Sequence, residues 1–273
     1  MKRALPSVLL HAALVAGAIL TLAPLAWMVS ASLMPTGAAN AIPPPLLPPR
    51  VTFEHYVELF THLDLARTFG NSLFVTVSAT LASLVINAMA GYAFAKLRFR
   101  GRDRLFQLLM GALVIPAQVG MMPLFLMVQG LGLVNTPWGV MIPALASIFG
   151  IFMIRQFALS IPDDLLDAAR IDGAGEFRIF WTVVLPVLRP ILVTLATFTF
   201  LSTWNDFMWP LIVLSDDAKY TLPVALANLS GEHVQDTELM MAGSVLTVLP
   251  VLALFLVMQR SYIRGVLMGS VKG

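Results

Sequence analysis

Hydrophobic residues along this chain are grouped into six long runs separated by short polar segments. A membrane core about 30 Å thick is crossed by roughly 20 helical residues, each rising about 1.5 Å. Six runs reach that length: residues 7–33, 69–95, 105–128, 137–157, 189–214 and 237–259. Pro143 and Gly150 interrupt the fourth run. The pattern predicts an all-α polytopic membrane protein with six transmembrane helices, in which residues 1–273 form one transmembrane domain.

The composition supports the membrane class and excludes several kinds of site. Hydrophobic residues make up 58% of the chain and charged residues only 12%, against about 25% charged residues in soluble domains. The chain has no cysteine, which excludes disulfides and thiolate chemistry. No metal site is expected, because the four histidines are scattered without metal-ligand spacing: His11, His55, His62 and His233. The basic residues are too dispersed for a nucleic-acid surface.

The distribution of basic residues predicts the orientation. Six spans place both termini on one side, and fourteen of the seventeen Lys and Arg residues fall on that side. The opposite side keeps Arg50, Arg67 and Lys219. The positive-inside rule therefore places both termini and the segment 158–188 in the cytoplasm. The first apolar run has about 27 residues, longer than the roughly 7–15 of a cleaved signal sequence, and is interpreted as an uncleaved span.

Two segments after the first span are expected on the outer side. The stretch "PPPLLPPR" at 43–50 predicts a stiff polyproline-like connector. Apolar residues then recur at helical spacing and predict a short helix in the outer membrane interface: Phe53, Tyr56, Val57 and Phe60.

The segment 158–188 is unusually polar and predicts a helix, a glycine turn and a second helix. Pro162 followed by Asp163 and Asp164 suits a helix N-terminus, and Gly173 suits a left-handed C-terminal position. Small and apolar residues form a stripe on the first helix: Leu165, Leu166, Ala168, Ala169 and Ile171. A stripe of small residues allows another protein surface to approach closely, so one interpretation is that the segment binds a partner. The alternative interpretation is a surface hairpin that only covers the inner end of the helix bundle.

The block "DAARIDGAGEFRIFWTVVLPVLRP" resembles the EAA loop of binding-protein-dependent ABC importer permeases. Further blocks, among them "FTFLSTWNDFMWPLIVL" and "QRSYIRGVLMGSVKG", resemble the carbohydrate-importer branch and its maltose-type six-span subunit. The motif positions fall on Asp167, Ala168, Ala169, Asp172, Gly173 and Ala174, and Phe180, Leu185, Pro186 and Pro190 complete it. One departure is Asp167, which stands where the family pattern has Glu and is shorter by one methylene.

The resemblance implies a non-catalytic subunit of a larger machine in the bacterial inner membrane. The first loop helix would be a coupling helix seated in a cleft of a cytoplasmic ATPase. The implied partners are a homologous second permease subunit, two ATP-binding-cassette subunits, an extracytoplasmic solute-binding protein and membrane lipid. No cofactor is expected in this chain, because ATP and Mg would be bound by the ATPase, and the chain contains no phosphate-binding G-x-x-x-x-G-K-[ST] motif.

Two sets of residues are candidates for solute handling. Trp204, Asn205 and Asp206 lie within the fifth span, where an aromatic ring, an amide and a carboxylate suit a sugar. The alternative is hydrogen bonding between helices, which is also the expectation for Asn71, Asn87 and Gln118. The acidic external segment 215–238 is expected to dock the binding protein through Asp216, Asp217 and Glu232, the alternative being a solvated loop.

The resemblance to the carbohydrate-importer branch implies that the transported solute is a di- or oligosaccharide, with a glycerol-phosphate-type solute as the alternative. An ion-coupled secondary transporter would need buried titratable groups, and the spans offer only Asp206. An intramembrane enzyme is disfavoured, because the sequence has no G-x-S-x-G motif and no histidine suitably placed as a base.

Overall fold

The structure, a computed structural model, describes residues 4–61, 64–232 and 236–270, and of residues 4–8, 230–232 and 260–270 only the backbone. Within these ranges all regular structure is helical. The chain divides into two compact units, one of residues 1–67 with 225–250 and one of residues 68–224 with 251–273. Each unit is described by itself below.

The first unit contains α1 (Ala4–Ala31), the short η1 (Ala38–Asn40), α2 (Glu54–Thr61) and the beginning of α14 (Thr237–Ser270). The start of α14 is joined to the segment after α1 by two hydrogen bonds. The fully buried Glu238 accepts the Ala39 N–H through Oε1 at 2.6 Å, and Thr237 Oγ1 donates to Asn40 Oδ1 at 2.7 Å. Two segments that are far apart in the sequence, the start of α14 and the chain after α1, therefore form one hydrogen-bonded layer in this unit.

The amphipathic helix expected near residue 53 is present as α2, but its predicted apolar stripe does not form the core. His55 and Leu59 are the buried residues of α2. Phe53, Val57 and Phe60 are exposed within this single chain. Such a stripe remains available to the membrane interface, as the sequence pattern predicts.

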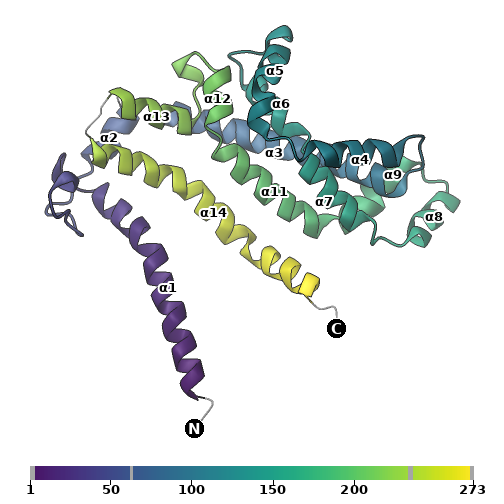
Figure 1. Ribbon diagram of the computed structural model, residues 1–273, viewed down its shortest axis with the longest axis horizontal. Helices are drawn as coiled ribbons and strands as arrows, with labels where there is room; N and C mark the ends of the chain where they lie inside the picture. Colours follow the sequence, from purple (N-terminus) through teal and green to yellow (C-terminus); the bar gives the residue numbers. More distant parts are fainter. Residues whose placement is uncertain (1–3, 62–63, 233–235, 271–273) are drawn as a thin grey trace. The chain divides into compact units, whose positions relative to one another are not determined.

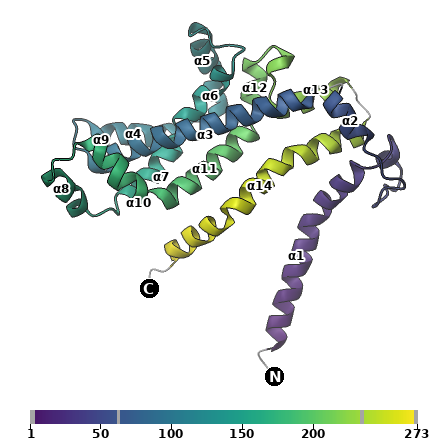
Figure 2. The same cartoon turned by 180° about the vertical axis from the view of Figure 1, so that it is seen from behind.

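The second unit is built along α3 (Leu65–Lys96), with α4 (Arg102–Ala112), α7 (Ile148–Ala158) and α11 (Arg189–Trp204) beside it (Figures 1 and 2). Helix α7 packs on both α4 and α11. Helix α3 approaches α7 so closely at Gly91 that an added Cβ would lie 2.5 Å from Ile154 Cγ2 and 3.0 Å from the Arg155 nitrogen. Small interface residues are the usual means of such close packing in membranes.

Several predicted spans are not single straight helices. In the described part of the chain four helices are long and apolar enough to cross a membrane: Leu9–Ala31, Leu65–Lys96, Pro137–Ala158 and Thr237–Gln259. Two bent pairs bring the number to six if each pair is one span. The third predicted span, 105–128, corresponds to α4 and α5 (Ala117–Gly130), which are bent by 110° at a break ending in Pro116. Proline removes a backbone donor and disfavours helical backbone in the residue before it, which explains the break.

The fifth predicted span is also interrupted. Helix α11 follows Glu176–Val187 at a bend of 81° and ends at Trp204, and α12 (Met208–Val213) follows after three residues. The external segment predicted at 215–238 contains the short η3 (Asp217–Lys219), α13 (Leu222–Glu232) and the start of α14. It is therefore largely helical and not an extended loop.

The fourth span consists of α6 (Pro137–Leu145) and α7, and the buried Asn87 of α3 covers the break between them. Asn87 Oδ1 accepts the Ser147 N–H at 3.0 Å, and its Nδ2 donates to the Leu145 carbonyl at 3.4 Å and the Ser83 carbonyl at 2.7 Å. Irregular backbone at membrane depth requires such partners, because lipid supplies none. The expected interhelical hydrogen bonding of Asn87 is confirmed.

Replacing Asn87 by Leu is expected to lower the thermal stability of the detergent-solubilised protein. The substitution removes the acceptor of the Ser147 N–H, and a buried backbone group without a partner costs about 1–3 kcal/mol. The measurement is the midpoint of thermal unfolding. Val85→Ala is the control on the same helix, because Val85 is exposed. An Asn87→Leu midpoint equal to that of the control would contradict the assigned role.

Candidate functional site

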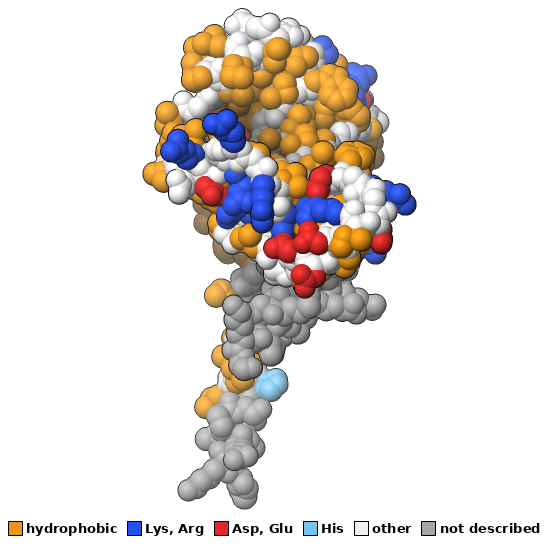
Figure 3. All heavy atoms as spheres, turned by 90° about the vertical axis from the view of Figure 1, so that its right-hand side faces the viewer, with side chains coloured by type: hydrophobic (Ala, Val, Ile, Leu, Met, Phe, Trp, Pro, Cys, Tyr) orange, Lys and Arg blue, Asp and Glu red, His pale blue; other side chains and the backbone are white. Residues whose placement is uncertain are grey.

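The second unit has one strongly charged end, which carries α8 (Asp163–Ile171). Figure 3 views the molecule from this side and shows Lys, Arg, Asp and Glu side chains gathered there, whereas hydrophobic side chains cover much of the surface above them. The segment predicted to be the coupling loop therefore lies on a polar surface at the end of an apolar helix bundle. This is the arrangement expected of a surface in water that meets another protein.

Helix α8 begins and ends as its sequence predicts. Asp163 and Asp164 occupy the first turn after Pro162, where carboxylates interact favourably with the helix dipole. At the other end Gly173 has φ of +79°. The Ala174 N–H donates to the Ala169 carbonyl at 3.0 Å, and the Gly173 N–H donates to the Arg170 carbonyl at 3.0 Å. These two bonds form a Schellman motif, which ends a helix sharply and fixes the direction of the following chain.

The small and apolar residues of α8 divide between two faces. Leu166 is buried at 1% exposure among residues of α3, α7 and the second loop helix, and Ala169 and Ala174 pack against the same core. The single stripe predicted from the sequence is thus incorrect in detail. Leu165 and Ile171 are exposed, at 45% and 87%, and Ala168 is exposed between them. Helix α8 is held by one face and presents a partly apolar face outward.

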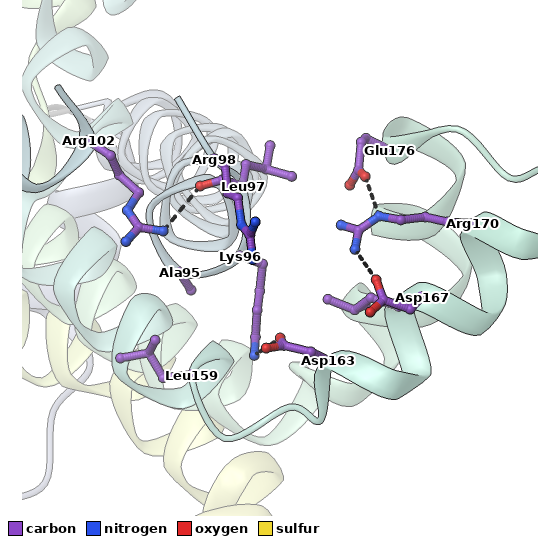
Figure 4. A pocket seen from close by; sticks show the side chains of 11 residues that line it. Ala95, Lys96, Leu97, Arg98, Arg102, Leu159, Asp163, Asp167, Arg170 and Glu176 are labelled. Atoms are coloured by element: carbon purple, nitrogen blue, oxygen red, sulfur yellow. Dashed lines mark hydrogen bonds and ion pairs between the residues drawn. The ribbon is translucent and has the colours of Figure 1, made fainter. Parts of the chain in front are cut away.

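A chain of polar contacts fixes the loop to α3. Arg170 Nη1 donates to Asp167 Oδ1 at 2.6 Å and Arg170 Nε to Glu176 Oε1 at 2.8 Å (Figure 4). Glu176 Oε2 accepts the hydroxyl of Tyr92 at 2.8 Å. The hydrogen bonds to Glu176 and then Asp167 raise the pKa of Arg170 above its ordinary value. Asp167, which stands where the family pattern has Glu, therefore forms an ion pair within α8, with Arg170 three residues later.

A second anchor lies at the start of α8. Lys96 Nζ at the end of α3 donates to Asp163 Oδ1 at 2.7 Å and to the Ile161 carbonyl at 2.6 Å. The Lys96 side chain is only 7% exposed. Its hydrogen bond and charge lower the pKa of the Asp163 carboxyl. The start of α8 is thus attached directly to α3, and its last turn is attached to α3 through Glu176 of α9.

An open cavity of about 1030 Å³ lies between α8 and the end of α3. Its lining carries both signs of charge: Lys96, Arg98, Arg102 and Arg170 together with Asp163, Asp167 and Glu176. Figure 4 shows Arg102, Arg98 and Lys96 on one side and the α8 network on the other. Such a hollow can receive charged side chains of a partner of either sign.

The second loop helix, which the sequence predicts, contains an irregular turn. It consists of α9 (Glu176–Ile179), a π-helical turn (Phe180–Val184) and α10 (Leu185–Val187). Single π-helical turns inside α-helices are rare and are frequently found at functional sites. The loop positions Asp172 and Gly173 are exposed. Sequence reasoning missed the anchors Tyr92 and Lys96, although Lys96 opens the basic segment 96–104.

Trp204, Asn205 and Asp206 lie at the break between α11 and α12. The ring of Trp204 is 1% exposed and packs on Phe200, with parallel planes, and on Phe69, edge to face. Asn205 Nδ2 donates to the Leu201 carbonyl at 2.8 Å, and Asp206 Oδ1 accepts the Trp209 N–H at 3.3 Å. In this conformation the tryptophan ring is covered by protein, whereas Asn205 is exposed and Asp206 half-buried.

The predicted docking residues lie in different local environments. Asp216 Oδ1 accepts the Ala218 N–H at 3.0 Å and its Oδ2 lies 3.3 Å from Lys219 Nζ, whereas Asp217 is exposed. Asn71 holds the same segment by donating to the carbonyls of Ala218 and Tyr220. The side chain of Glu232 lies outside the described residues, as do His62 and His233. Gln118 is exposed.

Comparison with solved structures places this architecture among known folds. A bacterial ABC transporter involved in the import of the acidic polysaccharide alginate contains a chain that matches with a TM-score of 0.82 and 26% identity, over 95% of this chain and 97% of that chain. A chain of a bacterial alginate ABC transporter in complex with an alginate pentasaccharide-bound periplasmic protein matches with a TM-score of 0.67 and 15% identity, over 93% and 94%. The second likeness shows the fold alone.

Comparison with curated sequences gives closer relatives. An arabinooligosaccharides transport system permease protein of Halalkalibacterium halodurans is 40% identical over 227 residues, covering 83% of this chain and 81% of the relative. A lactose transport system permease protein of Rhizobium radiobacter is 32% identical over 277 residues, covering 100% and 98%. The family described as "Binding-protein-dependent transport system inner membrane component" matches residues 83–267. The chain therefore belongs to this family of membrane-embedded transport components.

Proposed function

We propose that this chain is the permease subunit of an ATP-driven importer of a di- or oligosaccharide. The observation that carries the proposal is the outward face of α8, which is anchored to α3 directly at its start and through Glu176 at its last turn. The names of the relatives support the solute class, since arabinooligosaccharides, lactose and diacetylchitobiose are all carbohydrates. A phosphorylated solute such as a glycerol phosphate remains the alternative.

In this proposal α8 transmits motion between a cytoplasmic ATPase and the membrane helices. Leu165, Ala168 and Ile171 recur at three-residue spacing on the exposed side of α8. A helix with a small central residue and apolar neighbours suits a cleft on a partner. Because Lys96 holds the start of α8 and Glu176 joins Arg170 to Tyr92 of α3, displacement of α8 would move α3 with it. ATP and Mg would be bound by the two ATPase subunits and not by this chain.

Transport itself is proposed to proceed by alternating access. This subunit and a homologous second permease would rock as rigid bodies, and the ATPase would favour one arrangement because it contacts each differently. Both termini and α8 are proposed to lie in the cytoplasm, and the distribution of basic residues supports this orientation. Asn205 and Asp206 are proposed to face the solute path, and Trp204 would join them only if its packing against Phe69 and Phe200 is released.

On the outer side, the acidic segment is proposed to dock a solute-binding protein through Asp216, Asp217 and Glu232. The first two residues lie on or beside η3, which Asn71 and Asn135 hold in place by hydrogen bonds to its flanking backbone. A docking surface benefits from such ordering, because less conformational entropy is lost on binding.

Gly173→Pro is expected to release the ATPase subunit when the chain is purified from detergent-solubilised membranes. Proline fixes φ near −65° and has no N–H, whereas Gly173 has φ of +79° and donates to Arg170. Gly173→Ala should weaken retention less, with a strain of roughly 1–2 kcal/mol. The measurement is the amount of ATPase and second permease that co-purify.

Gly175→Ala is the matched control for this experiment. Gly175 lies two residues later with φ of −72°, and an added Cβ would have no neighbour within 4 Å. This variant should keep every partner. The coupling role would be wrong if Gly173→Pro also keeps every partner, or if the intact chain purifies alone.

Asp206→Asn separates the ATP-driven importer from an ion-coupled transporter. An amide oxygen can still accept the Trp209 N–H, so the helix break should persist. We expect solute uptake in cells to remain ATP-dependent and to change by no more than about tenfold, as for loss of one polar contact to a solute. Complete loss of uptake together with loss of proton coupling would favour the secondary transporter. Thr203→Ala, beside the same break, is the control.

A further inference from the structure

Three potential metal ligands meet in the first unit, although they are distant in the sequence. His55 and Glu58 lie one turn apart on α2, and Asp236 immediately precedes α14. One ligand atom from each of these residues lies within 4.8 Å of the other two. This cluster shares no residue with α8 or with the predicted solute path.

The hydrogen bonding of His55 determines which of its ring nitrogens is available. Nε2 lies 3.0 Å from the Met34 carbonyl oxygen, which can only accept a hydrogen bond, so Nε2 carries the proton. Nδ1 of the neutral ring is therefore an acceptor. It is buried, has no hydrogen-bond partner, and lies 3.8 Å from Asp236 Oδ1, with only 2% of the side chain exposed.

The cluster thus brings together an imidazole lone pair and two carboxylates without a donor between them. A metal ion bound between these acceptors would relieve their mutual repulsion, as would a proton on Nδ1. The separation of 3.8 Å exceeds the usual range of a hydrogen bond, about 2.7–3.2 Å. Two ligands of a tetrahedral zinc ion, each about 2.0–2.1 Å from the metal, lie about 3.3 Å apart, so a small side-chain adjustment suffices.

We propose that His55, Glu58 and Asp236 form a Zn²⁺ site. Imidazole nitrogen favours zinc and its transition-metal neighbours over the hard ions Ca²⁺ and Mg²⁺, and three protein ligands leave a position for water. Zinc-binding histidines usually donate their other N–H to a carbonyl or carboxylate, as His55 does to Met34. Asp236 Oδ1 also accepts the Leu239 N–H at 2.8 Å, and a carboxylate retains further lone pairs for a metal.

The bound ion would join α2 to the start of α14. The same layer already contains the contacts of Glu238 with Ala39 and of Thr237 with Asn40. A metal that binds only the folded protein stabilises it in proportion to the logarithm of its concentration. The inference is independent of the proposed transport function, because it depends on the geometry of three side chains in one unit.

The test uses the intact chain, purified from membranes in detergent with any subunits that accompany it, through an affinity tag without histidine. The protein is stripped with a chelator and titrated with Zn²⁺, and bound zinc per chain and the thermal midpoint are measured. We expect one tightly bound zinc ion per chain and a midpoint that rises with zinc concentration.

Two variants each replace one carboxylate metal ligand by an amide and are expected to leave the protein folded. Glu58→Gln changes a partly exposed side chain, and the amide oxygen of Asp236→Asn can still accept the Leu239 N–H. Each should weaken zinc binding by at least about tenfold and leave the metal-free midpoint unchanged. Glu54→Gln, one turn earlier on α2 and exposed, is the matched control and should bind zinc like the unaltered chain.

The proposal is overturned if the intact chain binds no zinc, or if both ligand variants bind it as tightly as the control. Stabilisation by Ca²⁺ or Mn²⁺ but not by Zn²⁺ would overturn the assignment of the metal. A midpoint that is insensitive to metals but rises as the pH falls would show that a proton bridges His55 and Asp236 instead.

Discussion

The absence of water from the membrane core obliges every backbone N–H and C=O group to find a partner inside the protein. An unbroken helix meets this requirement by itself, but this chain interrupts its helices repeatedly. The break between α6 and α7 depends on Asn87, whose amide both donates to Leu145 and accepts from Ser147. Asp206 accepts the Trp209 N–H at the break before α12. These two polar side chains therefore supply hydrogen-bond partners to the backbone where these helices are interrupted.

A different requirement governs α8, whose polar groups have water available. The helix is held in place by contacts to α3 and to the following helix α9. Arg170 contacts both Asp167 in its own helix and Glu176 in the next, and Glu176 accepts the Tyr92 hydroxyl. Each ion pair exposed to solvent contributes little to stability. The buried side chain of Leu166 also packs on this face of α8, so α8 is held on one side. The opposite side, with Leu165, Ala168 and Ile171, is exposed in this chain.

The sequence predicts the parts of this structure that depend on local chemistry. Hydrophobic length locates the spans, and Gly173 marks the end of α8 because only glycine adopts its backbone conformation without strain. The sequence does not show whether a proline breaks a membrane helix, because neighbouring helices can supply partners for the backbone carbonyl groups that the proline leaves unpaired. Pro143 leaves Pro137–Ala158 as one candidate span, whereas the break before Pro116 bends the chain by 110°. Tertiary contacts decide between these outcomes. The covering of Trp204 by Phe69 and Phe200 is invisible in the sequence for the same reason.

The cluster of His55, Glu58 and Asp236 illustrates a further limit of sequence reasoning. Motif spacing finds metal ligands that share a helix or loop, and here the third ligand comes from another part of the chain. Four buried side-chain atoms in the described residues lack hydrogen-bond partners: His55 Nδ1, Thr80 Oγ1, Thr221 Oγ1 and Glu238 Oε2. A hydroxyl can donate as well as accept a hydrogen bond, whereas a carboxylate oxygen and the unprotonated imidazole nitrogen can only accept one. Both of these acceptors belong to the first unit, the unit that contains the proposed zinc site.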